Sequence, residues 1–201
     1  MPAPRRSAAS AVAPVGAVLA GGAGRRLGGA KAVVELGGRP LLAYAVEALT
    51  AVLDDVVIVA KADSELPSLP GVPVWAEPDE VRHPALGIAH ALAIADGRPV
   101  LVCAGDQPFV PPALVRLLAG TDLGEAHAVV PRHAGELQPL LAVYAPAALE
   151  PLRAALDAPL RETVAALEPR LLEVDDPRPF FNVNRPEDLL HAAALLDRPA
   201  G

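Results

Sequence analysis

The chain has 201 residues, which is enough for one domain with a substantial buried core, and its formal net charge is −7. The acidic balance argues against a surface for nucleic acid, and an aromatic content of 3% leaves few rings to stack on unpaired bases. The single cysteine, Cys103, excludes an internal disulfide framework and predicts a reducing, cytoplasmic environment.

The apolar runs and the first residues bear on membranes and export. No uninterrupted apolar run approaches the roughly 20 residues that a membrane-spanning helix needs, so no membrane association is expected. Residues 1–13 combine two arginines with small residues and have no long apolar stretch, which we interpret as a disordered tail rather than a signal peptide. The folded domain is expected over residues 14–198.

Apolar runs of strand length alternate along the chain with stretches of helical spacing. In chain order, we expect strands at 15–20 and 32–36, a helix at 40–53, strands at 56–60 and 72–75, a helix at 85–95, a strand at 99–104, a helix at 113–119, strands at 126–131 and 140–144, helices at 146–156 and 160–167, a strand at 171–174 and a helix at 186–196. This alternation predicts an α/β fold, in which helices cover both faces of a mostly parallel sheet in one domain.

A glycine-rich loop with several cations follows the first predicted strand. It reads Ala20-Gly-Gly-Ala-Gly-Arg-Arg-Leu-Gly-Gly-Ala-Lys31. Glycines allow backbone N–H groups to approach an anion closely, and the cations indicate a ligand with several negative charges, such as a nucleoside triphosphate. The loop matches neither a Walker motif, because Ala32 follows the lysine, nor a dinucleotide fingerprint, because one residue too many separates Gly24 from Gly28. The alternative is a surface linker.

Asp106 is the sharpest single candidate for chemistry, because it lies directly after an apolar strand, between Gly105 and Pro108. In open α/β sheets, ligands bind beyond the carboxyl ends of the strands. A carboxylate at that edge suits Mg²⁺, which prefers one or two carboxylates together with phosphate oxygens and waters. The alternative is a turn or helix-capping aspartate before Pro111.

Several short motifs, in this order along the chain, carry a resemblance to a known family. They are Leu19-Ala-Gly-Gly, Arg26-Leu-Gly, Lys31, Pro40-Leu-Leu, Gly105-Asp-Gln-Pro-Phe-Val, Gln138-Pro-Leu and Phe181-Asn-Val-Asn-x-Pro-Glu-Asp-Leu. The series resembles the molybdenum cofactor guanylyltransferases, nucleotidyltransferases with a Rossmann-like sheet. The opening motif is shared across the nucleotidyltransferase superfamily, whereas the Phe-Asn-Val-Asn ending points to the molybdenum branch.

The resemblance implies a Mg²⁺-dependent transfer of GMP from GTP to the phosphate of molybdopterin, with release of pyrophosphate. It implies that nucleotide contacts come from the end of the first strand and its loop, namely Leu19, Ala20, Gly21 and Gly22. Arg26 and Lys31 are implied to neutralise the triphosphate, and Asp106 to hold the metal ion and the nucleotide. Asn182 and Asn184 are implied to line the acceptor side or complete the metal shell, the alternative being an Asx turn before the last helix. Contacts with cofactor-inserting proteins are also implied.

Two positions depart from the family pattern. Ala30 precedes Lys31, where relatives carry an acidic residue in a loop one residue longer. The turn for the base and ribose reads His83-Pro84-Ala85, so we take Asp79 as the candidate contact and Glu77 as the second choice. Either carboxylate is equally well interpreted as a solvated loop charge.

Other interpretations stay open. The same mechanism fits CTP or another phosphorylated acceptor, and the departures fit a non-catalytic nucleotide-binding module. A dehydrogenase is disfavoured by the failed fingerprint. The five histidines lack zinc-ligand spacing, and Cys103 and Trp75 are expected to pack in the core.

Overall fold

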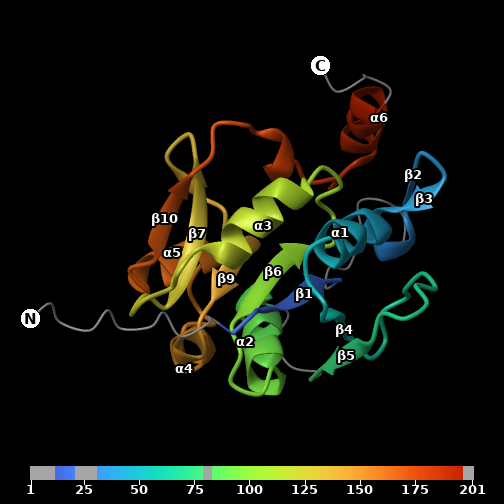
Figure 1. Cartoon of the computed structure of the whole chain (residues 1–201). Helices are drawn as coiled ribbons and strands as arrows, with labels where there is room; N and C mark the ends of the chain where they lie inside the picture. Colours follow the sequence, from blue (N-terminus) through green and yellow to red (C-terminus); the bar gives the residue numbers. More distant parts are fainter. Residues whose placement is uncertain (1–11, 21–30, 79–82, 197–201) are drawn as a thin grey trace, which may run out of the picture.

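A computed structural model describes residues 12–20, 31–78 and 83–196 and shows one sheet with helices packed on both faces (Figure 1). The strands of this sheet lie in the order β10-β7-β9-β6-β1-β4-β5, and β8 pairs with β7. Neighbours along this order are parallel except for β9, which runs antiparallel to β6 and to β7. The predicted α/β fold with a mostly parallel sheet is confirmed.

The elements follow the predicted order closely. The strands are β1 (Val15–Leu19), β2 (Glu35–Leu36), β3 (Arg39–Pro40), β4 (Val56–Lys61), β5 (Val74–Glu77), β6 (Val100–Ala104), β7 (Ala128–His133), β8 (Glu136–Leu137), β9 (Leu141–Tyr144) and β10 (Arg170–Glu173). The α-helices are α1 (Leu41–Thr50), α2 (Pro84–Ile94), α3 (Pro112–Gly120), α4 (Leu149–Ala154), α5 (Leu160–Ala166) and α6 (Pro186–Leu196). Short 3-10 helices are η1 (Lys31–Val33), η2 (Pro146–Ala148) and η3 (Arg178–Phe180).

Each face of the sheet has its own helices, because successive side chains of a strand point to opposite sides. Alternate residues of the central strands, such as Val57 and Val102, pack with α2, α4 and α5. The residues between them, such as Ile58 and Cys103, pack with α1 and α3. The central strands are therefore apolar on both sides, which explains their nearly continuous apolar sequence.

The largest difference from prediction lies at residues 32–36, which were expected to form a strand of the sheet. They form η1 and then β2, which pairs only with β3 in a separate hairpin. Gly37 and Gly38 both have positive φ, 58° and 76°, and close this hairpin by a two-residue turn. The places on either side of β1 are taken by β4 and β6, so the segment has no position in the main sheet.

Two further segments differ in detail. The helix expected over 146–156 is divided into η2 and α4, because Pro151 lacks the N–H that a continuous helix would bond to Ala147. The loop expected over 132–138 contains the end of β7 and β8. Ala134 and Gly135, with φ of 47° and 83°, form the turn between them.

Helix α6 lies beside the β2–β3 hairpin, so the last described helix packs on an early part of the chain (Figure 1). A small apolar cluster joins them, with Leu36, Leu41, Val183 and Ala192 as its buried members. Among the described residues, no helix has the length and apolar character to cross a membrane.

Candidate active site

The carboxyl ends of β1 and β6 form the centre of the candidate site. The two strands are parallel neighbours, and Leu19 pairs with Ala104 at their last residues. From β1 the chain adds β4 and β5 on one side of the sheet and then crosses by α2 to β6 on the other side. Such a reversal of strand order is the place where open α/β sheets bind ligands.

The end of β1 is held from both neighbouring strands. The N–H of Gly105 donates a hydrogen bond of 3.0 Å to the carbonyl oxygen of Leu19, and the N–H of Ala20 donates one of 2.9 Å to the carbonyl oxygen of Val59. Backbone hydrogen bonds on both sides leave the start of the glycine-rich loop in a defined place. Leu19 and Ala20, two predicted nucleotide contacts, therefore lie at the carboxyl edge as expected.

Gly105 allows a close approach of backbone and side chains. A Cβ atom at this position would lie 2.6 Å from Cδ1 of Leu42 and 3.2 Å from the carbonyl oxygen of Leu19. The first distance is far below an ordinary carbon contact, so a larger residue requires the buried Leu42 side chain to move and the backbone of β1 to shift slightly. Glycine thus brings the residue that follows, Asp106, directly against the end of β1.

Asp106 is half-buried, and its Oδ1 atom is enclosed by the protein. Its backbone carbonyl accepts a 3.0 Å hydrogen bond from the N–H of Val183. Burial, together with the nearby negative charge of Asp106, raises the pKa of the Cys103 thiol far above its usual range. Cys103 is therefore a neutral core residue, as predicted.

The segment with Asn182 and Asn184 lies against Asp106 through the Val183 hydrogen bond. The side-chain amide of Asn182 donates a 2.9 Å hydrogen bond to the carbonyl oxygen of Phe180, which holds the half-buried amide locally. The N–H groups of Asn184 and Arg185 each donate a 2.9 Å bond to Oδ2 of Asp188 at the start of α6. This carboxylate satisfies N–H groups that a helix start leaves open.

Several predicted site residues lie outside the described residues. These are Gly21, Gly22, Arg26 and Asp79. Lys31 is the first residue of η1, which comes directly after the undescribed part of the glycine-rich loop. The altered turn before α2 has a local reason, since Nδ1 of His83 accepts a 3.2 Å hydrogen bond from the N–H of Ala85 and Pro84 begins the helix.

Glu77, the second choice for the base and ribose, is the last residue of β5 and not part of a solvated loop. Its side chain is 9% exposed, and Oε1 lies 3.3 Å from Nζ of Lys61, whose side chain is 4% exposed. Lys61 also donates a hydrogen bond to the carbonyl oxygen of Pro78. The pattern analysis missed Lys61. The available signal was that two apolar strands, Val-Val-Ile-Val-Ala-Lys61 and Val-Trp-Ala-Glu77, end in opposite charges.

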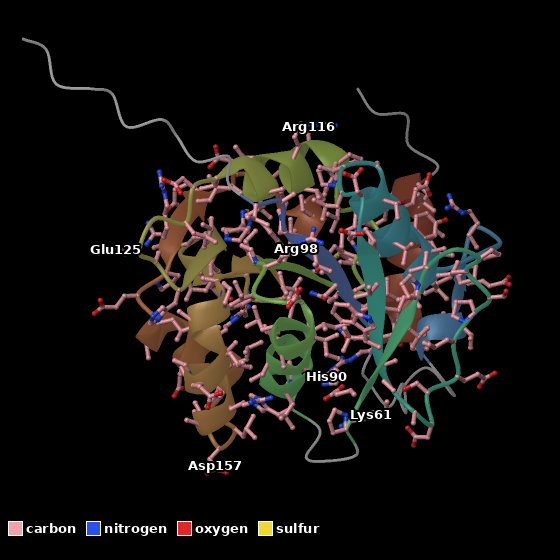
Figure 2. The ribbon with its side chains drawn as sticks, turned by 60° about the horizontal axis from the view of Figure 1, so that its bottom comes forward. Lys61, His90, Arg98, Arg116, Glu125 and Asp157 are labelled. Carbon is pink, nitrogen blue, oxygen red and sulfur yellow. The ribbon has the colours of Figure 1, made fainter. Side chains whose placement is uncertain are left out.

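A cavity of about 300 Å³ lies beside this ion pair, between the end of β5, α2 and α4. Its polar lining comes from Glu77, His90 and Arg153. Lys61 and His90 lie near each other in Figure 2, on neighbouring elements at one end of the molecule. Burial lowers the pKa of His90, with Arg153 and Lys61 adding to that effect and Glu77 opposing it.

Within residues 12–20, 31–78 and 83–196, no three side chains of His, Cys, Asp or Glu gather closely enough to hold a metal ion. A divalent cation at Asp106 would therefore take most of its ligands from phosphate oxygens and water. Mg²⁺ commonly binds in this way, with only one or two protein carboxylates.

The sequence and the fold are similar to those of known nucleotidyltransferases. Residues 16–171 match the family model of the MobA-like NTP transferase domain. A molybdenum cofactor guanylyltransferase of Rhodopseudomonas palustris is 34% identical over an alignment of 208 positions, which covers 96% of this chain and 97% of the relative. Molybdopterin-guanine dinucleotide biosynthesis protein A of Archaeoglobus fulgidus has a similar crystal structure, with a TM-score of 0.72, 27% identity and coverage of 90% of this chain and 97% of that one.

A third similar structure, from Mycobacterium tuberculosis, is a complex with manganese. Its TM-score is 0.69 at 20% identity, with coverage of 92% of this chain and all of that one. At this identity the likeness shows the fold alone.

Proposed function

The chain belongs to the family of MobA-like NTP transferases and is a nucleotidyltransferase, and from that premise we propose that it moves GMP from GTP to the phosphate of molybdopterin. The resemblance inferred from the motifs is thereby confirmed at the level of the family. The observation that carries the proposal is the meeting of Leu19, Asp106 and the Asn182–Asn184 segment at one sheet edge. Relatives named molybdenum cofactor guanylyltransferase support the choice of GTP and of the acceptor.

On the nucleotide side, we assign the backbone of Leu19, Ala20, Gly21 and Gly22 to contact with guanosine and its phosphates. The hydrogen bonds from Gly105 and Ala20 support this assignment, because they hold the start of the loop rigidly. Arg26 and Lys31 are assigned to stabilise the negative charge that builds on the leaving pyrophosphate. Asp79 is assigned to the base and ribose.

We assign Asp106 as the protein ligand of Mg²⁺. Its place one residue beyond Gly105, at the edge where phosphates are expected, supports a carboxylate–metal contact. When bound, the ion supplies positive charge that neutralises and orients the phosphate oxygens. Gly105 and the Val183 hydrogen bond keep the Asp106 backbone in place for that contact.

On the acceptor side, Asn182 and Asn184 are assigned to the molybdopterin pocket. A phosphate oxygen of the acceptor forms a new bond to the α-phosphorus of GTP, and the bond from that phosphorus to the leaving pyrophosphate breaks. The reaction depends on positioning and charge stabilisation and needs no covalent protein intermediate.

The decisive experiment is pyrophosphate release by the purified protein with Mg²⁺, molybdenum-loaded molybdopterin and each of GTP, CTP, ATP and UTP. Release with GTP alone is the expected result. Release with CTP retains the mechanism and overturns the choice of base. No release with any of the four overturns the proposed acceptor, and tight GTP binding in that case indicates a binding module.

A further inference from the structure

The buried ion pair of Lys61 and Glu77 joins the ends of two neighbouring parallel strands at the carboxyl edge. The two residues pair directly in the register of β4 and β5, and Nζ of Lys61 lies 3.3 Å from Oε1 of Glu77. The same ammonium donates a hydrogen bond to the carbonyl oxygen of Pro78, the residue after Glu77. Lys61 therefore holds both the side chain that ends β5 and the backbone that leaves it.

The ion pair and the proposed nucleotide contact Leu19 both lie near one residue of α2, Gly87. Glycine has no Cβ, but a Cβ atom placed on Gly87 of α2 would lie 3.4 Å from Cδ2 of Leu19 and 3.8 Å from Oε2 of Glu77. Gly87 of α2 therefore lies beside both Leu19, at the end of β1, and Glu77, at the end of β5, where Glu77 pairs with Lys61. The ends of β1 and β5 thus flank the same residue of α2, and the ion pair fixes the β5 side of this arrangement.

We propose that Lys61 and Glu77 are positioning residues for the nucleotide side of the site and set the affinity for the nucleoside triphosphate rather than the rate of transfer. The inference rests on the proposed function, since it assumes that the end of β1 contacts the nucleotide. Neither side chain is given a contact with the substrate. The pair acts by holding the end of β5 and the first turns of α2 against Leu19.

Two features argue that the pair has this role and is not simply a source of stability. Burying two charges costs desolvation energy that their attraction often only offsets, so an apolar pair of similar size commonly stabilises a protein as well. The pair also lies at the ligand-binding edge of the sheet, whereas the body of the sheet is apolar on both faces. A buried ion pair at this edge is explained if the ends of β4 and β5 have to be held in a fixed position relative to each other.

The test is the double variant Lys61→Met with Glu77→Leu, which removes both charges and leaves neither one buried alone. We expect a cooperatively folded protein with kcat within about twofold of wild type, and with KM and Kd for GTP raised about tenfold. Kd is measured by calorimetry with GTP and Mg²⁺ and without acceptor, so binding is determined separately from transfer. A folded double variant with wild-type Kd and KM overturns the inference.

A second variant covers the case in which the double variant does not fold. Lys61→Gln retains a polar group and loses the charge, and its rise in melting temperature on addition of GTP reports affinity relative to its own unliganded state. We expect this rise to be clearly smaller than in wild type at the same GTP concentration. An equal rise overturns the inference.

A control at the opposite edge of the sheet is the more exposed ion pair of Arg98 and Asp55, which lies before the starts of β6 and β4. Nη1 of Arg98 lies 2.5 Å from Oδ2 of Asp55. Arg98→Gln with Asp55→Asn should leave Kd for GTP unchanged, and an equal loss of affinity in this control contradicts a specific role for Lys61 and Glu77. If the wild-type protein binds no nucleoside triphosphate, the proposed function itself fails, which is a different result from a variant that binds as wild type does.

Discussion

The N–H of Val183 donates a 3.0 Å hydrogen bond to the carbonyl oxygen of Asp106, which joins the segment before the last helix to the turn after β6. Val183 is fully buried with Leu36, Leu41 and Ala192. The proposed metal ligand and the proposed acceptor contacts are therefore parts of one packed unit. We expect substitution of Asp106 to lower turnover, and substitution of Asn182 to weaken binding of the acceptor, so the two roles can be measured separately.

The first prediction concerns Asp106. Asp106→Asn keeps the size of the side chain and removes the charge, so we expect the fold to persist and pyrophosphate release to fall by at least about 100-fold, as is typical when charge stabilisation of a transferring group is lost. The measurement is turnover at saturating Mg²⁺, with circular dichroism as the check on folding. The control is Asp157→Asn on the connection between α4 and α5, which should retain wild-type turnover. A fully active Asp106→Asn enzyme contradicts the metal assignment.

The second prediction concerns Gly105. Gly105→Ala places a methyl group 2.6 Å from Cδ1 of Leu42 and 3.2 Å from the carbonyl oxygen of Leu19, and overpacking of this kind costs about 1–3 kcal/mol. We expect a lower free energy of unfolding in urea together with reduced turnover. Gly120→Ala is the control, because the added methyl group meets no atom within 4 Å apart from its chain neighbours and the backbone of its own helix. If both variants unfold at the same urea concentration, the close approach at Gly105 is not a constraint.

The third prediction separates the two substrates. Asn182→Ala removes an amide at the proposed acceptor side, together with its 2.9 Å hydrogen bond to Phe180. We expect KM for the molybdopterin acceptor to rise about fivefold or more, the effect of losing about one hydrogen bond to a substrate, while KM for GTP stays near its wild-type value. Steady-state kinetics with each substrate varied in turn gives both constants. A rise confined to GTP would place Asn182 on the nucleotide side.

The fourth prediction concerns stability and pH. Burial lowers the pKa of His90 from its usual range, so the unfolded chain takes up a proton at a pH at which the folded protein does not. This linkage destabilises the folded state as pH falls below about 6.5, the ordinary histidine pKa. We expect the melting temperature of His90→Gln to fall less between pH 7 and pH 5 than that of wild type. Identical profiles would show that His90 does not contribute to the acid sensitivity.

Much of the fold could be predicted from local patterns. Runs such as Val100–Ala104 are apolar at every position because both faces of the sheet are covered, and that composition is visible without any tertiary information. The segment at 32–36 had an equally plausible strand composition, yet it forms a separate hairpin. Pairing depends on which neighbours are free, and β4 and β6 already occupy both sides of β1.

The site was predictable in its parts. The position of Asp106 directly after an apolar strand, together with its neighbour Gly105, is enough to indicate the carboxyl edge of the sheet. The opposite charges at the ends of two apolar strands made Lys61 and Glu77 possible partners, but the sequence did not show that these strands are neighbours, because strand pairing is a long-range contact. Glu77 was accordingly expected in a polar loop, whereas strand pairing buries it at the end of β5.

The sequence by itself determined the α/β alternation, the glycine-rich loop after β1, the carboxylate after β6 and the family of the chain. Each of these features depends on a pattern of residues that are close together in the sequence. Only the tertiary structure decided that Val183 forms a hydrogen bond with Asp106 and that Lys61 pairs with Glu77. It also decided that Leu42 lies too close to Gly105 for a side chain there to fit without a shift. The physical reason is that periodicity and turn chemistry act over a few residues. Strand order and side-chain packing are set by the competition of distant segments for the same buried surface.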